Sequence, residues 1–254
     1  MYNNADGLQM NNEIISDKMN IFQRIGNLLF NPRKLFAFTA RKPTILFPVI
    51  VLVILSIVPN LLLMEQYQGT FADTIYSAGN TAGGEITVDQ AETMAKWLAV
   101  GTVASAPFTM IIRWILATLI LYPVFRLAGC EKGMKKYFSM IAYITVIAVL
   151  GQIVHSLYIY YTGETLMSVQ VTSLASLVGD ESMGSFLYAV IASIEVFNIW
   201  TYILYGIGFA YTGGVKKQKA YLVSAVLFVA AALINAGAAH FTTQLAGLSG
   251  IAVK

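Results

Sequence analysis

Residues 44–64 read TILFPVIVLVILSIVPNLLLM, an apolar run that contains no charged side chain. The hydrocarbon core of a bilayer is about 30 Å thick, and an α-helix needs about 20 apolar residues to cross it. The run does not alternate between apolar and polar residues as a strand of a membrane β-barrel does. The sequence therefore predicts a membrane-spanning helix over 44–64.

Four more runs of similar or greater length follow along the chain, at 105–127, 138–161, 185–210 and 220–241. The 254 residues are 57% hydrophobic and only 11% charged, whereas a soluble domain carries about 25% charged residues. The mean hydropathy is +0.67. So few charges cannot cover the surface of a water-soluble globule. The expected fold class is an all-α integral membrane protein with five transmembrane helices.

Lysine and arginine residues are concentrated in alternate connections between these runs. Six precede the first run, four lie at 126–136 and three lie at 216–219, whereas the other side has only Lys96 and Lys254 against eight acidic residues. Basic connections stay on the cytoplasmic side of a membrane. We therefore expect the amino terminus inside and the carboxyl terminus outside a plasma (cell) membrane.

The chain then divides into four parts by composition. These are a polar, disordered tail (1–18), an amphipathic basic interfacial segment (19–42), the five-span helical membrane domain (43–242) and a short outer tail (243–254). Within the membrane domain, residues 65–96 are rich in Gly and Thr and contain several acids. They are expected to form a solvated outer loop.

The interfacial segment reads MNIFQRIGNLLFNPRKLFAFTARK. Its apolar residues recur at helical spacing over a length too short to cross a bilayer, which suits a helix that lies in the interface. Asn31 followed by Pro32 favours the start of a second short helix. The basic residues can meet anionic head groups as an anchor or can dock a cytoplasmic partner; they are Arg24, Arg33, Lys34, Arg41 and Lys42.

Two charges lie inside the apolar runs, Arg113 in the second and Glu195 in the fourth. At 1.5 Å per residue they lie roughly 12 Å and 14 Å below the outer boundary. A mutual ion pair is then the least costly arrangement. The same outer half holds four more polar side chains, Gln152, His155, Asn198 and Asn235. This intramembrane polar layer either joins helices by hydrogen bonds or forms a small cavity that binds a substrate or relays a proton.

Small residues four positions apart mark places where membrane helices can approach closely. Such pairs occur at Gly101 and Ser105, Ala189 and Ser193, and Ala232 and Ala236. The stretch 230–239 is also rich in alanine. The fifth helix is therefore the one expected to pack most closely against another helix.

The sequence lacks the residue patterns of the common enzyme classes. It contains no H-E-x-x-H zinc helix, no phosphate-binding G-x-x-x-x-G-K-[ST] loop, no G-x-S-x-G elbow and no G-x-G-x-x-G turn. One cysteine, Cys130, and two histidines exclude a disulfide framework and leave little for a metal cage. We expect no enzymatic activity, no cofactor, no metal and no nucleic-acid partner.

Two stretches of the chain carry a family resemblance: FQRIGNLLFNPRKLFAFTARKPTILFPVI at 22–50 and FNIWTYILYGIGFAYTGGVKKQKAY at 197–221. They resemble the Yip1-domain family, and the resemblance covers about residues 20–240. It implies five membrane spans and a cytosolic amino terminus. For eukaryotic relatives it implies membrane trafficking with small GTPases. For some bacterial relatives it implies an accessory subunit beside an ATP-driven exporter.

The sequence thus favours a non-enzymatic membrane scaffold or accessory subunit that assists another membrane complex, such as an ABC-type exporter. Its expected partners are the lipid bilayer and either another integral membrane protein or a second copy of the chain. One alternative is a small-solute or proton-coupled transporter that uses the Arg113 and Glu195 layer. Another is a membrane-trafficking adaptor like the eukaryotic relatives.

Overall fold

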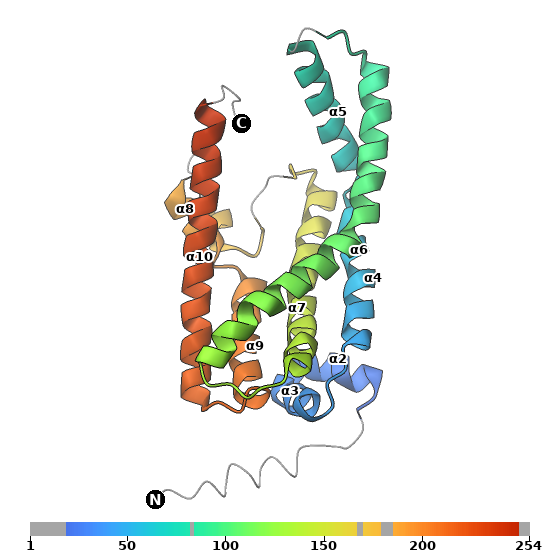
Figure 1. The fold of residues 1–254 in the computed structure, drawn as a ribbon. Coiled ribbons are helices and arrows are strands. Elements are labelled where there is room, and N and C mark those ends of the chain that lie inside the picture. Colours follow the sequence, from blue (N-terminus) through green and yellow to red (C-terminus); the bar gives the residue numbers. More distant parts are fainter. Residues whose placement is uncertain (1–18, 82–83, 167–169, 179–184, 249–254) are drawn as a thin grey trace, which may run out of the picture.

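A computed structural model describes residues 19–81, 84–166, 170–178 and 185–248. Long helices dominate these residues (Figure 1). In chain order the helices are α2 (Ile21–Phe30), α3 (Pro32–Arg41), α4 (Leu46–Leu62), α5 (Met64–Thr81), α6 (Val88–Leu127), α7 (Met134–Thr162), the 3-10 helix η1 (Leu174–Leu177), α8 (Phe186–Ala192), α9 (Val196–Tyr211) and α10 (Lys217–Leu248). The tail expected at 1–18 lies outside the described residues, and α10 takes up the first part of the tail expected at 243–254.

Three helices within the described ranges are long and apolar enough to cross a membrane: α6, α7 and α10. The pair α4 and α5 passes the same test together but is bent by 59° at its break, so the number rises to four if this pair is one span. The described residues therefore form an all-helical bundle in which several helices have the length and composition of membrane spans. The fourth expected span, 185–210, accounts for the difference from five.

The run 185–210 is not one continuous helix. α8 ends at Ala192 and α9 begins at Val196. Between them, the carboxylate of Glu195 accepts hydrogen bonds from the backbone N–H groups of Phe197 (2.9 Å) and Asn198 (2.6 Å). A side chain that satisfies the first amides of a helix favours a helix start over helix continuation. Hydropathy alone cannot reveal such a break.

The connection expected as an outer loop, 65–96, is mostly a helical hairpin made by α5 and the start of α6 (Figure 1). α6 has 40 residues, which corresponds to about 60 Å, or twice the hydrocarbon thickness. Ala91, Ala95 and Ala99 are buried along this part of α6. Their four-residue spacing places these methyl groups on one face, which lets α5 pack closely alongside.

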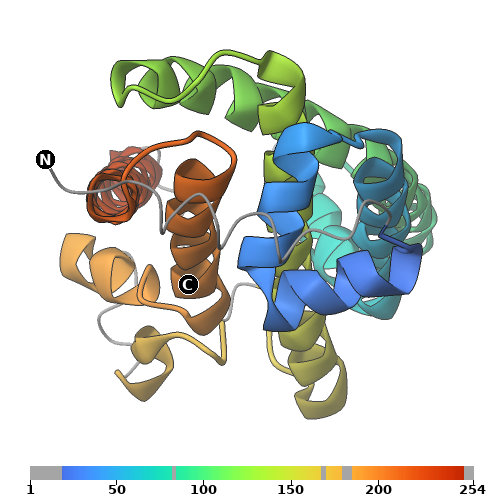
Figure 2. The same ribbon diagram turned by 90° about the horizontal axis from the view of Figure 1, so that it is seen from below.

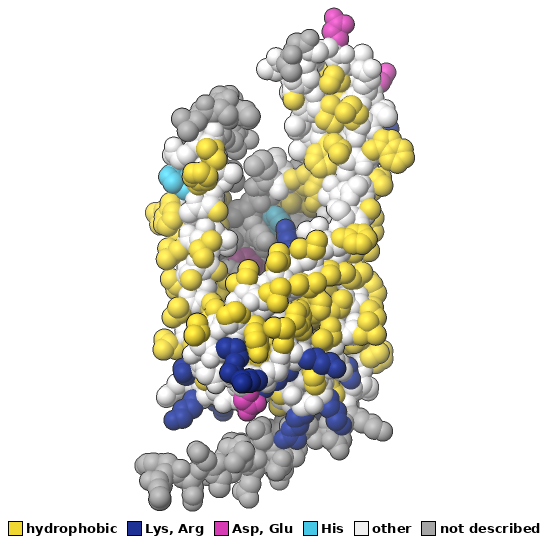
Figure 3. Space-filling model, in the orientation of Figure 1, with side chains coloured by type: hydrophobic (Ala, Val, Ile, Leu, Met, Phe, Trp, Pro, Cys, Tyr) yellow, Lys and Arg dark blue, Asp and Glu magenta, His cyan; other side chains and the backbone are white. Residues whose placement is uncertain are grey.

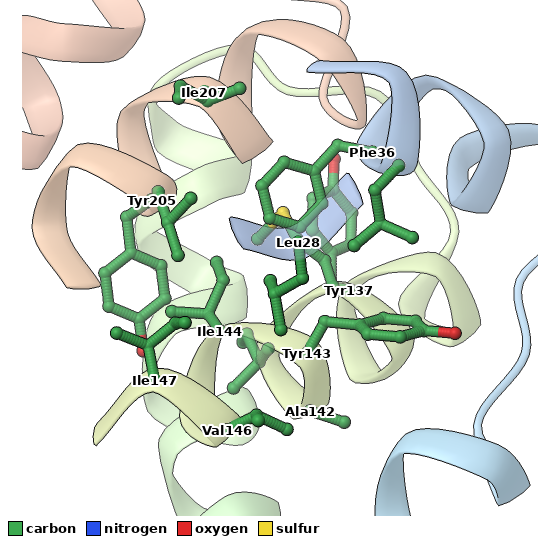
Figure 4. Packing of buried hydrophobic residues seen from close by; sticks show 14 of the residues in the cluster. Leu28, Phe36, Tyr137, Ala142, Tyr143, Ile144, Val146, Ile147, Tyr205 and Ile207 are labelled. Atoms are coloured by element: carbon green, nitrogen blue, oxygen red, sulfur yellow. The ribbon is translucent and has the colours of Figure 1, made fainter. Parts of the chain in front are cut away.

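The main core lies at the opposite end of the bundle, around the first half of α7 (Figure 4). Figure 2 shows the ribbon from this end, with α2 and α3 in front. α7 packs against α4 and α9. The side chains buried there come mainly from α2, α3, α4, α6, α7 and α9. Figure 4 shows Leu28, Phe36 and Tyr137 grouped together, with Tyr205 beside Ile147. This core closes that end of the bundle with apolar side chains.

The interfacial segment differs from expectation in its second half. Leu35, Phe36 and Thr39 of α3 are fully buried, and α3 packs on α9 and α7 rather than lying on the surface. In α2, by contrast, Phe22 and Phe30 are 85% and 87% exposed. An apolar helical face can be covered by lipid or by protein, and here only α2 keeps the exposed face that an interfacial helix requires.

Charged side chains separate toward the two ends of the molecule (Figure 3). We call the end formed by α3 and the connections 128–133 and 212–216 the basic end. The two connections meet where the Glu131 N–H donates to the Gly213 carbonyl (2.9 Å), and Thr212 Oγ1 donates to the Phe36 carbonyl of α3 (3.3 Å). Acidic side chains lie at the far tip of the α5–α6 hairpin (Figure 3).

Candidate functional site

A polar hollow of about 400 Å³ lies between α4, α5, α6 and α7. Figure 3 shows a hollowed area beside α6, with dark-blue, cyan and magenta side-chain atoms in view inside it and apolar side chains around it. The magenta carboxylate is not part of the lining of the hollow. The polar side chains that line the hollow are Ser56, Asn60, Tyr67, Thr102, Ser105, Thr109, Arg113, Gln152, His155, Ser156 and Gln170. Small-molecule sites usually measure about 300–1,000 Å³, so the hollow has the size of a ligand site.

The hollow occupies the half of the bundle farther from the basic end. Arg113 lies fourteen residues before Leu127, the last residue of α6, which is about 21 Å along the helix. Asn60 lies fourteen residues into α4, counted from Leu46. The apolar core around Tyr137, Ile141 and Ile144 fills the other half. Packed apolar side chains therefore close the hollow on the side that faces the basic end.

Arg113 carries the positive charge of the hollow. Its side chain is exposed, and no hydrogen bond or ion pair joins it to another residue in the part of the chain that the structure describes. An arginine at the centre of a membrane helix costs about 2.5–3.5 kcal/mol on insertion scales unless water or a partner satisfies it. The guanidinium therefore requires water or an anion in the hollow.

Hydroxyl groups of α6 form the wall next to this guanidinium. Thr102 Oγ1 donates to the Leu98 carbonyl (3.0 Å), Ser105 Oγ to the Thr102 carbonyl (3.0 Å) and Thr109 Oγ1 to the Ser105 carbonyl (3.1 Å). Because each hydroxyl hydrogen is engaged by the backbone of its own helix, each oxygen keeps lone pairs for an outside donor. This wall accepts hydrogen bonds while Arg113 donates them.

α4 and α5 add a second polar contact at the hollow. Asn60 Nδ2 donates to the Ser56 carbonyl (2.9 Å), and the Tyr67 hydroxyl donates to Asn60 Oδ1 (3.4 Å). These bonds fix the Asn60 amide between the two helices. They also tie the outer end of α4 to α5 just after the bend.

The polar layer expected from the sequence is divided in the structure. Arg113, Gln152 and His155 do line one hollow, but Glu195 does not. Glu195 is 6% exposed, and its carboxylate accepts from Thr172 Oγ1 and from the two amides at the start of α9. The expected Arg113–Glu195 ion pair is therefore wrong, because helix capping occupies the carboxylate.

The remaining two members of that layer also lie elsewhere. Asn198 Nδ2 donates to the Ser193 carbonyl (2.8 Å) and so helps to close the break between α8 and α9. Asn235 is exposed on α10, a helix that packs against α8 and α9. Neither residue lines the hollow.

Sequence reasoning missed the hydroxyl wall of α6. Thr102, Ser105, Thr109 and Arg113 are spaced by three, four and four residues, which is the spacing of one helical face. Thr102 precedes the expected span 105–127, so the four polar residues do not fall within one predicted helix. In a helix that continues outward beyond residue 105, this spacing predicts one polar face, which is the part of the lining that α6 contributes.

The basic patch is also divided. Arg24 is half-buried: its Nε donates to the Met19 carbonyl (3.0 Å) and its guanidinium to Thr44 Oγ1 (3.2 Å). It also lies 5.3 Å from the Phe38 ring centre. Arg24 therefore fixes α2 against α3 and α4. Surface contacts are left to the remaining residues of the patch, Arg33, Lys34, Arg41 and Lys42.

Metal binding finds no support in the described ranges. No group of three or more His, Cys, Asp or Glu side chains within them is placed to hold an ion. Cys130 is buried in the connection between α6 and α7. Arg113 instead lines the hollow together with amide and hydroxyl side chains, a set that can donate and accept hydrogen bonds.

Comparison with known proteins points to one family. The family model described as the Yip1 domain matches residues 26–238. The chain is 24% identical over 221 residues to a protein described as membrane protein YknW of Bacillus subtilis (strain 168), covering 87% of this chain and 90% of that protein. No solved structure matches the chain significantly.

Proposed function

Because this chain belongs to the Yip1 domain family, we propose that it is a non-enzymatic accessory subunit or scaffold of another membrane complex, such as an ATP-driven exporter. The match spans most of the chain, and it includes both the basic end and the hollow. The relative YknW is described only as a membrane protein. Support for the accessory role comes from the shape and polarity of the bundle.

The proposed topology has five spans, with the basic end in the cytoplasm. α4 with the start of α5, α6, α7, the broken pair α8 and α9, and α10 would cross in turn. The gathering of Lys and Arg side chains at one end supports this orientation (Figure 3). The α5–α6 hairpin would then extend outside the membrane.

One observation carries the accessory role: the hollow has a floor of packed apolar side chains. A permease needs a polar route that reaches both faces of the membrane in turn. Below the hollow, the core residues Met140, Ile141, Ile144 and Leu204 are fully buried, and they close the way to the basic end in this conformation. The bundle is thus better suited to bind something than to pass it through, which favours a subunit that assists another protein.

Purification in a mild detergent tests the proposal. The tagged full chain should be recovered with an ATPase or permease subunit of an exporter at a fixed ratio, and an unrelated multi-pass protein with the same tag should not. The proposal fails if the chain is recovered alone and moves solute across liposomes by itself. That result would establish the transporter alternative instead.

A further inference from the structure

We propose that the hollow between α4, α5, α6 and α7 is a binding site for an anionic group, a phosphate or carboxylate, attached to a hydroxyl-bearing unit. The site is independent of the exporter partner proposed above, because all of its described lining belongs to this chain. Arg113 would bind the anion, and the hydroxyl wall of α6 would bind the neighbouring hydroxyl groups.

The sign of the ligand's charge follows from the lining. Arg113 lines the hollow, and no carboxylate does so among the described residues. The Glu195 carboxylate, which could have neutralised Arg113, is buried and engaged by Thr172, Phe197 and Asn198. A guanidinium presents five donors in a planar fork that fits phosphate and carboxylate oxygens. The hollow therefore selects an anion.

The hydroxyl wall of α6 indicates that the ligand also carries hydroxyl groups. Thr102, Ser105 and Thr109 donate to their own backbone, so their oxygens are acceptors toward the hollow. A fully deprotonated inorganic anion such as sulfate offers acceptors only and would leave these oxygens to water. A polyol phosphate offers both an anion for Arg113 and hydroxyl donors for the wall.

The surroundings of the hollow favour this ligand over a helix from a partner protein. The hollow lies on a face with apolar side chains around it (Figure 3), and the proposed topology places Arg113 in the outer half of the bilayer core. An apolar transmembrane helix would leave the Arg113 guanidinium and the Gln152 amide without hydrogen-bond partners and would offer no donor to the wall oxygens, which is unfavourable in hydrocarbon. A phospholipid can bring its head group to such a place from the side, whereas a soluble polyol phosphate would enter from the outer aqueous phase.

The test titrates the purified full chain, in an uncharged detergent, with short-chain phosphatidylglycerol and separately with glycerol 1-phosphate, and measures binding by calorimetry. Phosphatidylcholine of the same chain length is the zwitterionic comparison. The wild-type chain should bind phosphatidylglycerol or glycerol 1-phosphate more tightly than phosphatidylcholine. Binding of phosphatidylglycerol alone assigns the ligand to the lipid, and binding of glycerol 1-phosphate assigns it to the polyol phosphate itself.

Three variants locate the binding. Arg113→Gln should weaken it at least tenfold. Lys96→Gln removes the same charge from an exposed position farther out on α6 and should leave it unchanged. Ser105→Phe keeps Arg113 but fills part of the hollow, so it should also weaken binding, and it decides the matter if Arg113→Gln does not fold. The proposal is overturned if the chain binds none of the anionic probes, or if both folded hollow variants bind them as the wild-type chain does.

Discussion

Arg24 joins three helices through a single side chain. Its guanidinium group donates to the Met19 carbonyl and to Thr44 Oγ1, and it lies near the rings of Phe38 and Phe47 (5.3 Å and 5.8 Å to the ring centres). Thr44 in turn contacts the Tyr143 hydroxyl of α7 (3.2 Å). The chain's first described charge is therefore part of the packing at the basic end.

Arg24→Ala should lower the free energy of unfolding by about 2–3 kcal/mol, because charged hydrogen bonds and cation–π contacts are lost together. Arg33→Ala removes an exposed arginine from the neighbouring helix and should change stability by less than about 0.5 kcal/mol. Unfolding by SDS titration in mixed micelles measures both variants. Equal effects of the two substitutions would show that Arg24 is only a surface charge.

Cys130 lies in the connection between α6 and α7 and is 1% exposed. Burial raises the pKa of the Cys130 thiol, an effect that a hydrogen bond with Tyr137 and the nearby Lys136 partly offset. Alkylation requires the thiolate, whose fraction falls about tenfold for each unit by which the pKa rises. A maleimide should therefore label the folded chain much more slowly than the SDS-unfolded chain.

The rate of labelling of the folded chain should still be rising between about pH 7 and pH 9, since a raised pKa leaves the thiol protonated over more of this range. Mass spectrometry of timed samples measures the rate. Rapid labelling at neutral pH that is insensitive to unfolding would contradict the buried placement of Cys130.

At the scale of elements, α7 and α9 are held close by glycine. A Cβ atom on Gly151 of α7 would lie 2.8 Å from the Cβ atom of Phe197 on α9, closer than two such atoms can approach. By contrast, a Cβ atom on Gly101 of α6 would meet no other atom within 4 Å. These two glycines therefore separate the effect of close helix packing from that of helix propensity.

Gly151→Ala should destabilise the bundle by about 1–3 kcal/mol through overpacking, whereas Gly101→Ala should stabilise it by about 0.5–1 kcal/mol, because alanine is the better helix former. The same SDS titration measures both changes. Shifts of the same sign and size would mean that α7 and α9 do not approach each other as closely as the structure has them.

Elements were predictable from sequence where hydropathy alone decides them. The runs 138–161 and 220–241 lie within α7 and α10, and both helices pass the test for a membrane span. The break at Glu195 was not predictable, because it depends on a side chain that bonds to the backbone two and three residues ahead. The outward extension of α6 was not predictable for a related reason: residues 88–104 are too polar for a membrane span, yet they continue the helix.

Of the expected small-residue contacts between helices, one pair is buried in the structure and another is exposed. Ala232 and Ala236 of α10 are buried, on the helix that packs against α8 and α9. Gly101 and Ser105 are exposed, and Ser105 lines the hollow instead. The same spacing serves a helix contact in one place and a polar wall in another, and only the three-dimensional neighbours distinguish the two.

At the scale of the whole molecule, the proposed orientation makes two exposed positions diagnostic. Lys216 lies at the basic end and Asp89 lies at the start of α6, on the far hairpin. Since Cys130 is the single cysteine of the chain, single-cysteine variants can be made in a Cys130→Ser background.

In intact cells, a membrane-impermeant maleimide should label Asp89→Cys, and it should label Lys216→Cys only after permeabilisation, because basic connections are retained in the cytoplasm. Gel-shift analysis of the labelled protein reads both positions. Labelling of both positions from one compartment would overturn the five-span, amino-end-inside arrangement.

The burial of α3 has a consequence for how the chain is made. The Phe36 carbonyl of α3 accepts from Thr212 Oγ1, 176 residues further along the chain. At ribosomal rates of 5–20 residues per second, roughly 10–35 s separate the synthesis of these two residues. During that interval α9 has not been synthesised, so the nascent α3 lacks one of the helices against which it packs. Its apolar side would lie on the lipid surface and would move into the bundle once α9 is in place. The membrane surface would thus cover, for a time, apolar side chains that are buried in the finished protein.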